Sequence, residues 1–124
     1  MAAKKRYGLV LVVEDQPKTA ELTEVMLIEI EIPEVRIAAS FAEADQLLSE
    51  RDYDLAILDF NMGEAASWSI AKRLCDRGTQ IIVTTSEPVL SLPASCGNAD
   101  ILQKPYSLND LAALVKTERK DTEQ

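Results

Sequence analysis

Three short, unbroken runs of apolar residues constrain the fold of this chain more than any other feature. They read GLVLVV from Gly8 to Val13, DLAIL from Asp54 to Leu58, and QIIVT from Gln80 to Thr84. Such runs, rich in β-branched residues, are typical of strands buried on both faces, as in parallel sheets. The alternating segment Val35–Ala39 predicts a strand nearer an edge, and Ala99–Gln103 predicts a fifth strand.

The segments between these runs have helical periods. Pro17 stands where the first helical position is expected, and an apolar face is then predicted from Leu22, Val25, Met26 and Ile30. A third helix is expected from about Ala65 to Asp76, ending before Gly78. Two capping boxes of the S-x-x-E and S-x-x-D form predict further helix starts, at Ser40 with Glu43 and at Ser107 with Asp110.

One interval departs from this regular alternation. Ser86 to Asn98 contains Pro88, Pro93 and Gly97, which leaves no room for a long helix, so a short or irregular fourth helix is expected. Strand–helix alternation repeated five times predicts a doubly wound α/β fold. In this fold a five-stranded parallel sheet carries helices on both faces. At 124 residues the chain has room for one domain.

Composition excludes several classes of function. The net charge of −8 would be repelled by phosphate backbones and anionic lipid, so no direct binding to nucleic acid or membrane is expected. The chain has no histidine, which excludes Ser-His and Cys-His catalysis and His-ligated metals. Cys75 and Cys96 are expected to be reduced thiols, and the absence of a leader or apolar span predicts a cytoplasmic protein.

Polar side chains follow the ends of the predicted strands, where the sites of open parallel sheets form. Carboxylates packed this closely raise one another's pKa unless a cation neutralises them, and oxygen ligands suit Mg²⁺ with a phosphoryl oxygen. The sequence therefore predicts a magnesium site built to hold a phosphoryl group. The side chains concerned are Glu14, Asp15, Asp59, Thr85, Ser86 and Lys104.

Four separated motifs resemble the signature of response-regulator receiver domains. They are VVEDQP (Val12–Pro17), LAILDFNM (Leu55–Met62), the pair Thr85-Ser86, and LQKPYS (Leu102–Ser107). Their order and spacing follow the family over nearly the whole chain. The resemblance implies a receiver domain over residues 7–116, with the charged segments 1–6 and 117–124 expected to be flexible ends.

The resemblance also implies a role for each site residue. Asp59 would be the phosphoacceptor, and Glu14, Asp15, Asp59 and the Asn61 carbonyl would hold Mg²⁺. Thr85 with Ser86 would bind the phosphoryl group, with Thr84 as the alternative to Thr85. Lys104 would pair with that group, and Pro105 would follow a cis peptide bond.

Three positions relate to how such a domain signals. Many receivers carry Tyr or Phe three positions before the lysine as a switch, and here that position is Ile101. Output by that route is therefore in doubt. Asn61 and Glu87 stand at positions that tune water access to the acyl phosphate, and their amide and carboxylate can orient an attacking water.

The resemblance implies partners outside the chain. A sensor histidine kinase or a histidine phosphotransfer protein would supply the phosphoryl group, and a separate output protein would read it. The chain would be no enzyme beyond self-phosphorylation and autodephosphorylation.

Several alternatives are weighed beside this interpretation. They are a degenerate receiver used only for docking, a small Mg²⁺-dependent aspartyl-phosphate phosphatase, and a flavodoxin-like nucleotide binder. The phosphatase is disfavoured because no D-x-D run follows the first strand. Glycines at only 8, 63, 78 and 97 allow neither G-x-G-x-x-G nor a P-loop, which disfavours the nucleotide binder.

Overall fold

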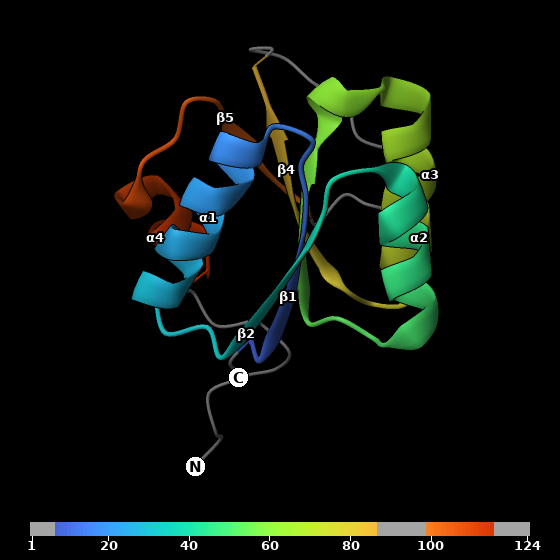
Figure 1. The fold of residues 1–124 in the computed structure, drawn as a ribbon, viewed down its shortest axis with the longest axis horizontal. Coiled ribbons are helices and arrows are strands. Elements are labelled where there is room, and N and C mark those ends of the chain that lie inside the picture. Colours follow the sequence, from blue (N-terminus) through green and yellow to red (C-terminus); the bar gives the residue numbers. More distant parts are fainter. Residues whose placement is uncertain (1–6, 87–98, 116–124) are drawn as a thin grey trace.

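The computed structural model describes residues 7–86 and 99–115. Among these, five parallel strands form one sheet in the order β2-β1-β3-β4-β5, with two helices on each face (Figure 1). This confirms the predicted doubly wound α/β fold. The elements are β1 (Leu9–Val13), α1 (Pro17–Glu29), β2 (Glu34–Ala38), α2 (Phe41–Glu50), β3 (Leu55–Asp59), a 3₁₀ turn η1 (Phe60–Met62), α3 (Glu64–Asp76), β4 (Gln80–Thr85), β5 (Asp100–Gln103) and α4 (Leu108–Val115).

Three expectations concern segments outside the residues that the structure describes. The short fourth helix is expected between Ser86 and Asn98, and all of that interval except Ser86 lies outside the described residues. The flexible ends 1–6 and 117–124 lie outside them as well.

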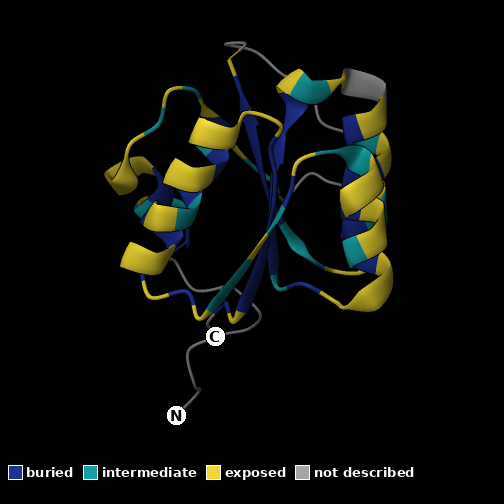
Figure 2. Cartoon of the chain, in the orientation of Figure 1, coloured by how far each residue is buried: buried dark blue, intermediate teal, exposed yellow. Residues whose placement is uncertain are grey.

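The sheet separates two apolar cores, and this explains the unbroken apolar run of β1. Leu9, Leu11 and Val13 belong to the core under α2 and α3. Val10 and Val12 alternate with them and belong to the core under α1 and α4. Successive side chains of a strand point to opposite faces, so a strand with a core on each side is apolar at every position. Figure 2 shows the resulting buried central strands between partly exposed helices.

β2 is an edge strand, as its alternating sequence predicted. It pairs with β1 alone among the described strands, from Leu9 opposite Glu34 to Val13 opposite Ala38. Its first four residues are only partly buried or exposed, while Ala38 is buried.

The predicted helix starts are confirmed, that of α1 by the position of its proline and those of α2 and α4 by side-chain caps. Pro17 opens α1, and the Glu43 N–H donates to Ser40 Oγ at 3.1 Å at the start of α2. Before α4 the box is reciprocal. The Asp110 N–H donates to Ser107 Oγ at 3.1 Å, and the Ser107 N–H donates to Asp110 Oδ2 at 3.0 Å.

The predicted apolar face of α1 is partly wrong. Met26 and Ile30 are buried as expected, but Leu22 and Val25 are 55% and 52% exposed. The buried positions within the helix are instead Ala20, Thr23, Met26 and Leu27. α1 carries apolar residues on more than one side, so its helical period alone did not determine which side would be buried. The side that is buried includes Thr23, which takes part in a hydrogen bond.

The state of one cysteine differs from the prediction. Cys75, on α3, is disulfide-bonded, with its partner outside the described residues, so the expectation of a reduced thiol is wrong at this position. Composition carries no information on whether a fold brings a cysteine to a bonding partner.

Within the described ranges no helix is long and apolar enough to cross a membrane.

Candidate functional site

The strand order brings three carboxylates to one edge of the sheet. β1 pairs directly with β3, so Glu14 and Asp15, which follow β1, lie beside Asp59 at the end of β3. Carboxylate oxygens of the three residues lie within 4.8 Å of one another. Glu14 and Asp59 are buried at 3% and 2% exposure, whereas Asp15 is exposed. The cluster therefore has two sheltered acids and one that faces solvent.

Lys104 supplies a positive charge to this cluster. Its Nζ lies 3.1 Å from Glu14 Oε1 and 3.1 Å from Asp59 Oδ1. The backbone N–H of Lys104 donates to the Thr85 carbonyl oxygen at 2.8 Å, which fixes the start of this side chain against the end of β4. Two buried carboxylates and one ammonium leave the group with an excess of negative charge.

The pKa values of Glu14 and Lys104 reflect this setting. Burial raises the pKa of Glu14, and a hydrogen bond with the neighbouring Asp59 carboxyl raises it further. The Gln16 N–H, which donates to Glu14 Oε2 at 3.1 Å, opposes that rise. For Lys104, burial lowers the pKa, but its contacts with Asp59 and Glu14 outweigh burial and leave the pKa raised. Lys104 therefore stays an ammonium at neutral pH.

The turn after β3 is held to both Asp59 and β4. The Asn61 N–H donates to Asp59 Oδ1 at 2.9 Å, so one carboxylate oxygen is oriented by the turn that follows it. The Asn61 side-chain oxygen accepts the Ser86 N–H at 3.1 Å. Gly63, at φ 140°, takes a backbone conformation unfavourable for other residues where the chain passes into α3.

Two neighbouring threonines end β4, and both are buried. Thr84 lies opposite Asp59 in the register, and its hydroxyl donates to the Leu58 carbonyl oxygen at 3.4 Å. Thr85 is the last residue of the strand, and its carbonyl accepts the Lys104 N–H. Ser86 is exposed and joins Asn61. The Thr84 hydroxyl is thus engaged within the sheet.

The remaining predicted positions divide into three groups. The Lys104–Pro105 peptide bond is cis, as the resemblance implied. Ile101, in place of a switch aromatic, lies on β5 and is 45% exposed. Glu87 lies outside the described residues.

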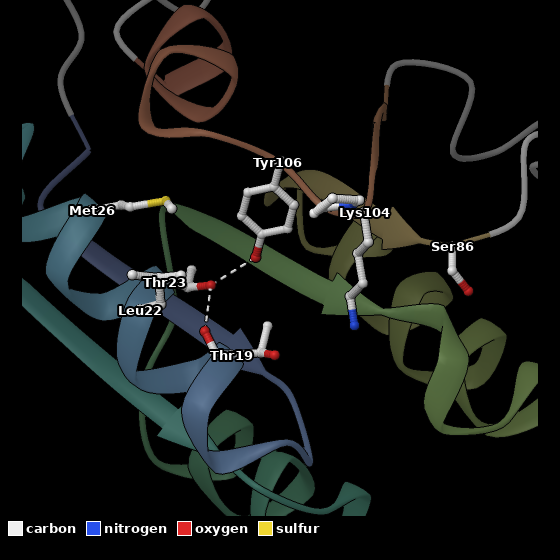
Figure 3. Close-up of a pocket in the computed structure, with 8 residues that line it drawn as sticks. Thr19, Leu22, Thr23, Met26, Ser86, Lys104 and Tyr106 are labelled. Atoms are coloured by element: carbon white, nitrogen blue, oxygen red, sulfur yellow. Dashed lines mark hydrogen bonds between the residues drawn. The ribbon is translucent and has the colours of Figure 1, made fainter.

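A cavity beside the site was not expected from the sequence. Its volume is about 350 Å³, and it lies between α1 and the segment after β5 (Figure 3). Two of the residues that line it are hydrogen-bonded to each other, the Tyr106 hydroxyl lying 2.7 Å from Thr23 Oγ1. Burial raises the pKa of Tyr106 above 10. The residues that line the cavity are Thr19, Leu22, Thr23, Met26, Ser86, Lys104, Pro105 and Tyr106. The LQKPYS motif drew attention to Tyr106, but no pattern in the sequence links it to Thr23.

The acidic cluster fits a divalent cation. All three donors are carboxylate oxygens within 4.8 Å of one another, which matches the preference of Mg²⁺ for hard oxygen ligands. Asp15 is exposed, so the cluster is open to the waters that Mg²⁺ retains. Glu14, Asp15 and Asp59 are therefore the residues that would hold the ion.

Several known proteins resemble this chain. PilR of Pseudomonas aeruginosa, a response regulator protein, is 29% identical over 112 residues, which cover 86% of this chain and 25% of PilR. CusR of Escherichia coli, a transcriptional regulatory protein, is 30% identical over 112 residues, which cover 86% of this chain and 49% of CusR. The chain thus spans a quarter to about half of the length of these curated relatives.

Solved structures show the same likeness. The response regulator TrrA from Thermotoga maritima, in complex with Mg²⁺ and BeF, is 28% identical with a TM-score of 0.74, over 88% of this chain and 96% of TrrA. A two-component response regulator from Clostridium difficile has a TM-score of 0.76 at 22% identity, over 88% of this chain and 93% of that chain. Residues 10–116 match the family model for the response regulator receiver domain. The chain belongs to the response regulator receiver domain family.

Proposed function

We propose that Asp59 accepts a phosphoryl group from a phosphohistidine on a partner protein. The phosphorylated domain then changes its contacts with a separate output protein or passes the group on as a shuttle. One observation carries this proposal: the buried Asp59 carboxylate lies in direct contact with the Lys104 ammonium, beside the Glu14 and Asp15 carboxylates. The family supports a partner of the histidine kinase or histidine phosphotransfer type.

In the proposed reaction an Asp59 carboxylate oxygen attacks the phosphorus atom. A phosphorus–oxygen bond forms as the phosphorus–nitrogen bond of the phosphohistidine breaks, and the released imidazole takes up a proton. The Asn61 N–H holds Asp59 Oδ1, which directs the carboxylate for attack. Lys104 would pair with a phosphoryl oxygen, and the Thr85 hydroxyl would donate to another.

Mg²⁺, held by Glu14, Asp15, Asp59 and the Asn61 carbonyl, would neutralise the negative charge that the carboxylates and the phosphoryl group bring together. We infer no turnover of a separate substrate. The chemistry is confined to phosphorylation of Asp59 and hydrolysis of the aspartyl phosphate.

Two other interpretations account less well for the site. A docking module would not need a lysine held 3.1 Å from each of two buried carboxylates, since buried charge is costly to maintain. An aspartyl-phosphate phosphatase would place its nucleophile after β1, where Glu14 is engaged by Lys104 and Gln16 instead.

We further propose that the phosphoryl group is short-lived, as suits a shuttle or a phosphate sink. By the resemblance to the family, the Asn61 amide and the Glu87 carboxylate would orient water for hydrolysis. Replacing both with apolar residues, Asn61→Met with Glu87→Leu, should slow the decay of the phosphorylated protein after donor removal. A half-life of hours in the wild type would contradict the shuttle role.

The test of the main proposal uses acetyl phosphate as the phosphodonor. The purified protein with Mg²⁺ should gain one acid-stable, base-labile phosphoryl group, and chelation of the metal should prevent this. Asp59→Asn should gain none. Full labelling of Asp59→Asn would show that another residue is the nucleophile.

A further inference from the structure

A directed chain of hydrogen bonds joins the segment after β5 to α1. The Tyr106 hydroxyl lies 2.7 Å from Thr23 Oγ1, and Thr23 Oγ1 donates to the Thr19 carbonyl oxygen at 2.9 Å (Figure 3). A threonine hydroxyl has one proton, and here it goes to Thr19. Tyr106 is therefore the donor toward Thr23, and the chain runs from the tyrosine to the helix backbone.

This connection lies next to Lys104 in the chain. The backbone N–H of Lys104 is held by the Thr85 carbonyl of β4, and two residues later Tyr106 is held by α1. The segment that carries Lys104 is thus fixed at both ends, on two different elements. Between these anchors the side chain extends to place Nζ 3.1 Å from Glu14 and from Asp59.

The Tyr106 ring is partly buried and packs against the core under α1 and α4, but not on every side. The ring borders the cavity of about 350 Å³ that Leu22 and Met26 line from α1. A side chain beside an open cavity lacks contact atoms on that side, so its position depends more on its other interactions. Thr23 is buried at 1% exposure and gives the tyrosine hydroxyl a fixed acceptor.

We propose that Tyr106 and Thr23 are positioning residues for Lys104. Their hydrogen bond holds the segment after β5 against α1 and thereby keeps the Lys104 ammonium over Asp59 and Glu14. The consequence for the reaction rests on the proposed function, because it assumes that Lys104 assists phosphoryl transfer. The positioning itself can be measured without any phosphodonor.

The kinetic experiment removes the Tyr106–Thr23 hydrogen bond while keeping the shape of each side chain; Thr23→Val also removes the bond from Thr23 to the Thr19 carbonyl oxygen. Tyr106→Phe and Thr23→Val should each slow phosphorylation by acetyl phosphate about fivefold, the factor that corresponds to one ordinary hydrogen bond. The double variant should be no slower than either single variant, and Thr23→Ser should restore the rate. In a Lys104→Met background Tyr106→Phe should have no further effect.

A matched control removes a tyrosine hydroxyl at the other end of the sheet. Tyr53 precedes β3, is buried, and lies away from Asp59 along that strand. Tyr53→Phe should leave the phosphorylation rate unchanged. An equal slowing in Tyr53→Phe, or a Tyr106→Phe effect that persists without Lys104, would overturn the positioning role.

A spectroscopic readout separates this proposal from the proposed function. The proton-detected ¹H–¹⁵Nζ correlation signal of Lys104 in the metal-free protein is sharp while hydrogen bonds protect the ammonium protons from rapid exchange. It should be present in the wild type, in Thr23→Ser and in Tyr53→Phe, and broadened in Tyr106→Phe and Thr23→Val. An unchanged signal in the last two would overturn the proposal, even if Asp59 is the phosphoacceptor. Failure of the wild type to take label would instead overturn the proposed function alone.

Discussion

An aspartate lies at each end of the central strand β3: Asp54 at the amino end is half-buried, and Asp59 at the carboxyl end is buried. The two aspartates have different surroundings. At the amino end, Asp54 Oδ2 accepts the N–H groups of Gly8 at 2.8 Å and Leu9 at 2.9 Å. At the carboxyl end, Asp59 faces the Glu14 carboxylate and the Lys104 ammonium. Asp54 accepts backbone N–H groups at the start of β1, which is a structural task. Asp59 lies among charges that attract a cation and a phosphoryl group, which is a chemical one.

The two aspartates therefore differ in role because their hydrogen-bond and ionic partners differ, more than because their burial differs. A carboxylate whose lone pairs are taken by backbone N–H groups has little left to offer a ligand. A carboxylate that faces another carboxylate needs an added cation to reach a low-energy state. Four predictions test this separation, from the largest expected effect to the smallest.

The largest effect is expected from the aspartates themselves. Asp59→Asn should lose all phosphoryl label and stay folded. Asp54→Ala should keep its label, but its free energy of unfolding should fall by about 2 kcal/mol, because Gly8 and Leu9 lose their acceptor. Phosphate incorporation and urea denaturation measure the two effects. A folded Asp54→Ala protein without label would show that the two ends are coupled.

Lys104 should matter for both rate and stability. Lys104→Met leaves Glu14 and Asp59 without their cation, so phosphorylation should slow about 10- to 100-fold. The free energy of unfolding at pH 7 should fall by about 2 kcal/mol.

Lys72→Met is the matched control. Lys72 forms an exposed ion pair with Asp76 on α3 at 3.2 Å, and its loss should change stability by less than about 0.5 kcal/mol. Equal stability losses in the two variants would remove the distinction between the site and the surface.

Glu14 should make the stability of the protein depend on pH. Its pKa is raised from 4.5 by burial and by Asp59, so the folded state binds this proton more tightly than the unfolded state. The stabilisation is complete below about pH 4.5 and is lost as pH rises through the raised pKa. Compared with Glu14→Gln, the wild type should therefore lose free energy of unfolding as pH rises from 4.5 toward neutrality.

Glu34 provides a control of opposite sign for that titration. Arg51 and Arg36 lower the pKa of Glu34, so its contribution is present at neutral pH and is lost as pH falls through the lowered pKa. Denaturant titrations of wild type, Glu14→Gln and Glu34→Gln from neutrality to below pH 4.5 check both signs, with the Glu14 effect above pH 4.5 and the Glu34 effect below it. The same sign for both variants would contradict the assignment.

The smallest effect is expected in Trp68 fluorescence. The Trp68 ring packs edge to face on Phe60, the residue after Asp59, with ring centroids 4.6 Å apart. Mg²⁺ should therefore cause a small, saturable change in emission, which Asp15→Ala should weaken. A full response in Asp15→Ala would exclude Asp15 from the metal site.

The elements and the strand-end residues could be predicted because local sequence determines them. The apolar run of β1 follows from having a core on each side, and the Ser107–Asp110 box marks the start of α4 through bonds between near neighbours. The cluster of Glu14, Asp15 and Asp59 followed from a general rule for parallel sheets.

Features that depend on distant partners were not predictable in the same way. The burial of Thr23 in place of Leu22 accompanies a hydrogen bond to Tyr106, 83 residues away along the chain. The disulfide of Cys75 and the contact between Asn61 and Ser86 likewise depend on packing that no local pattern encodes.

The separation of the two cores by a single sheet bears on how such a domain can diversify. Side chains of β1 alternate between a core under α1 and α4 and a core under α2 and α3, with the backbone between them. Substitutions on opposite faces share no packing partners, so their effects on stability should add. The residues of one helical layer can therefore change and come to bind new partners, while the other layer and the strand-end carboxylates stay unchanged.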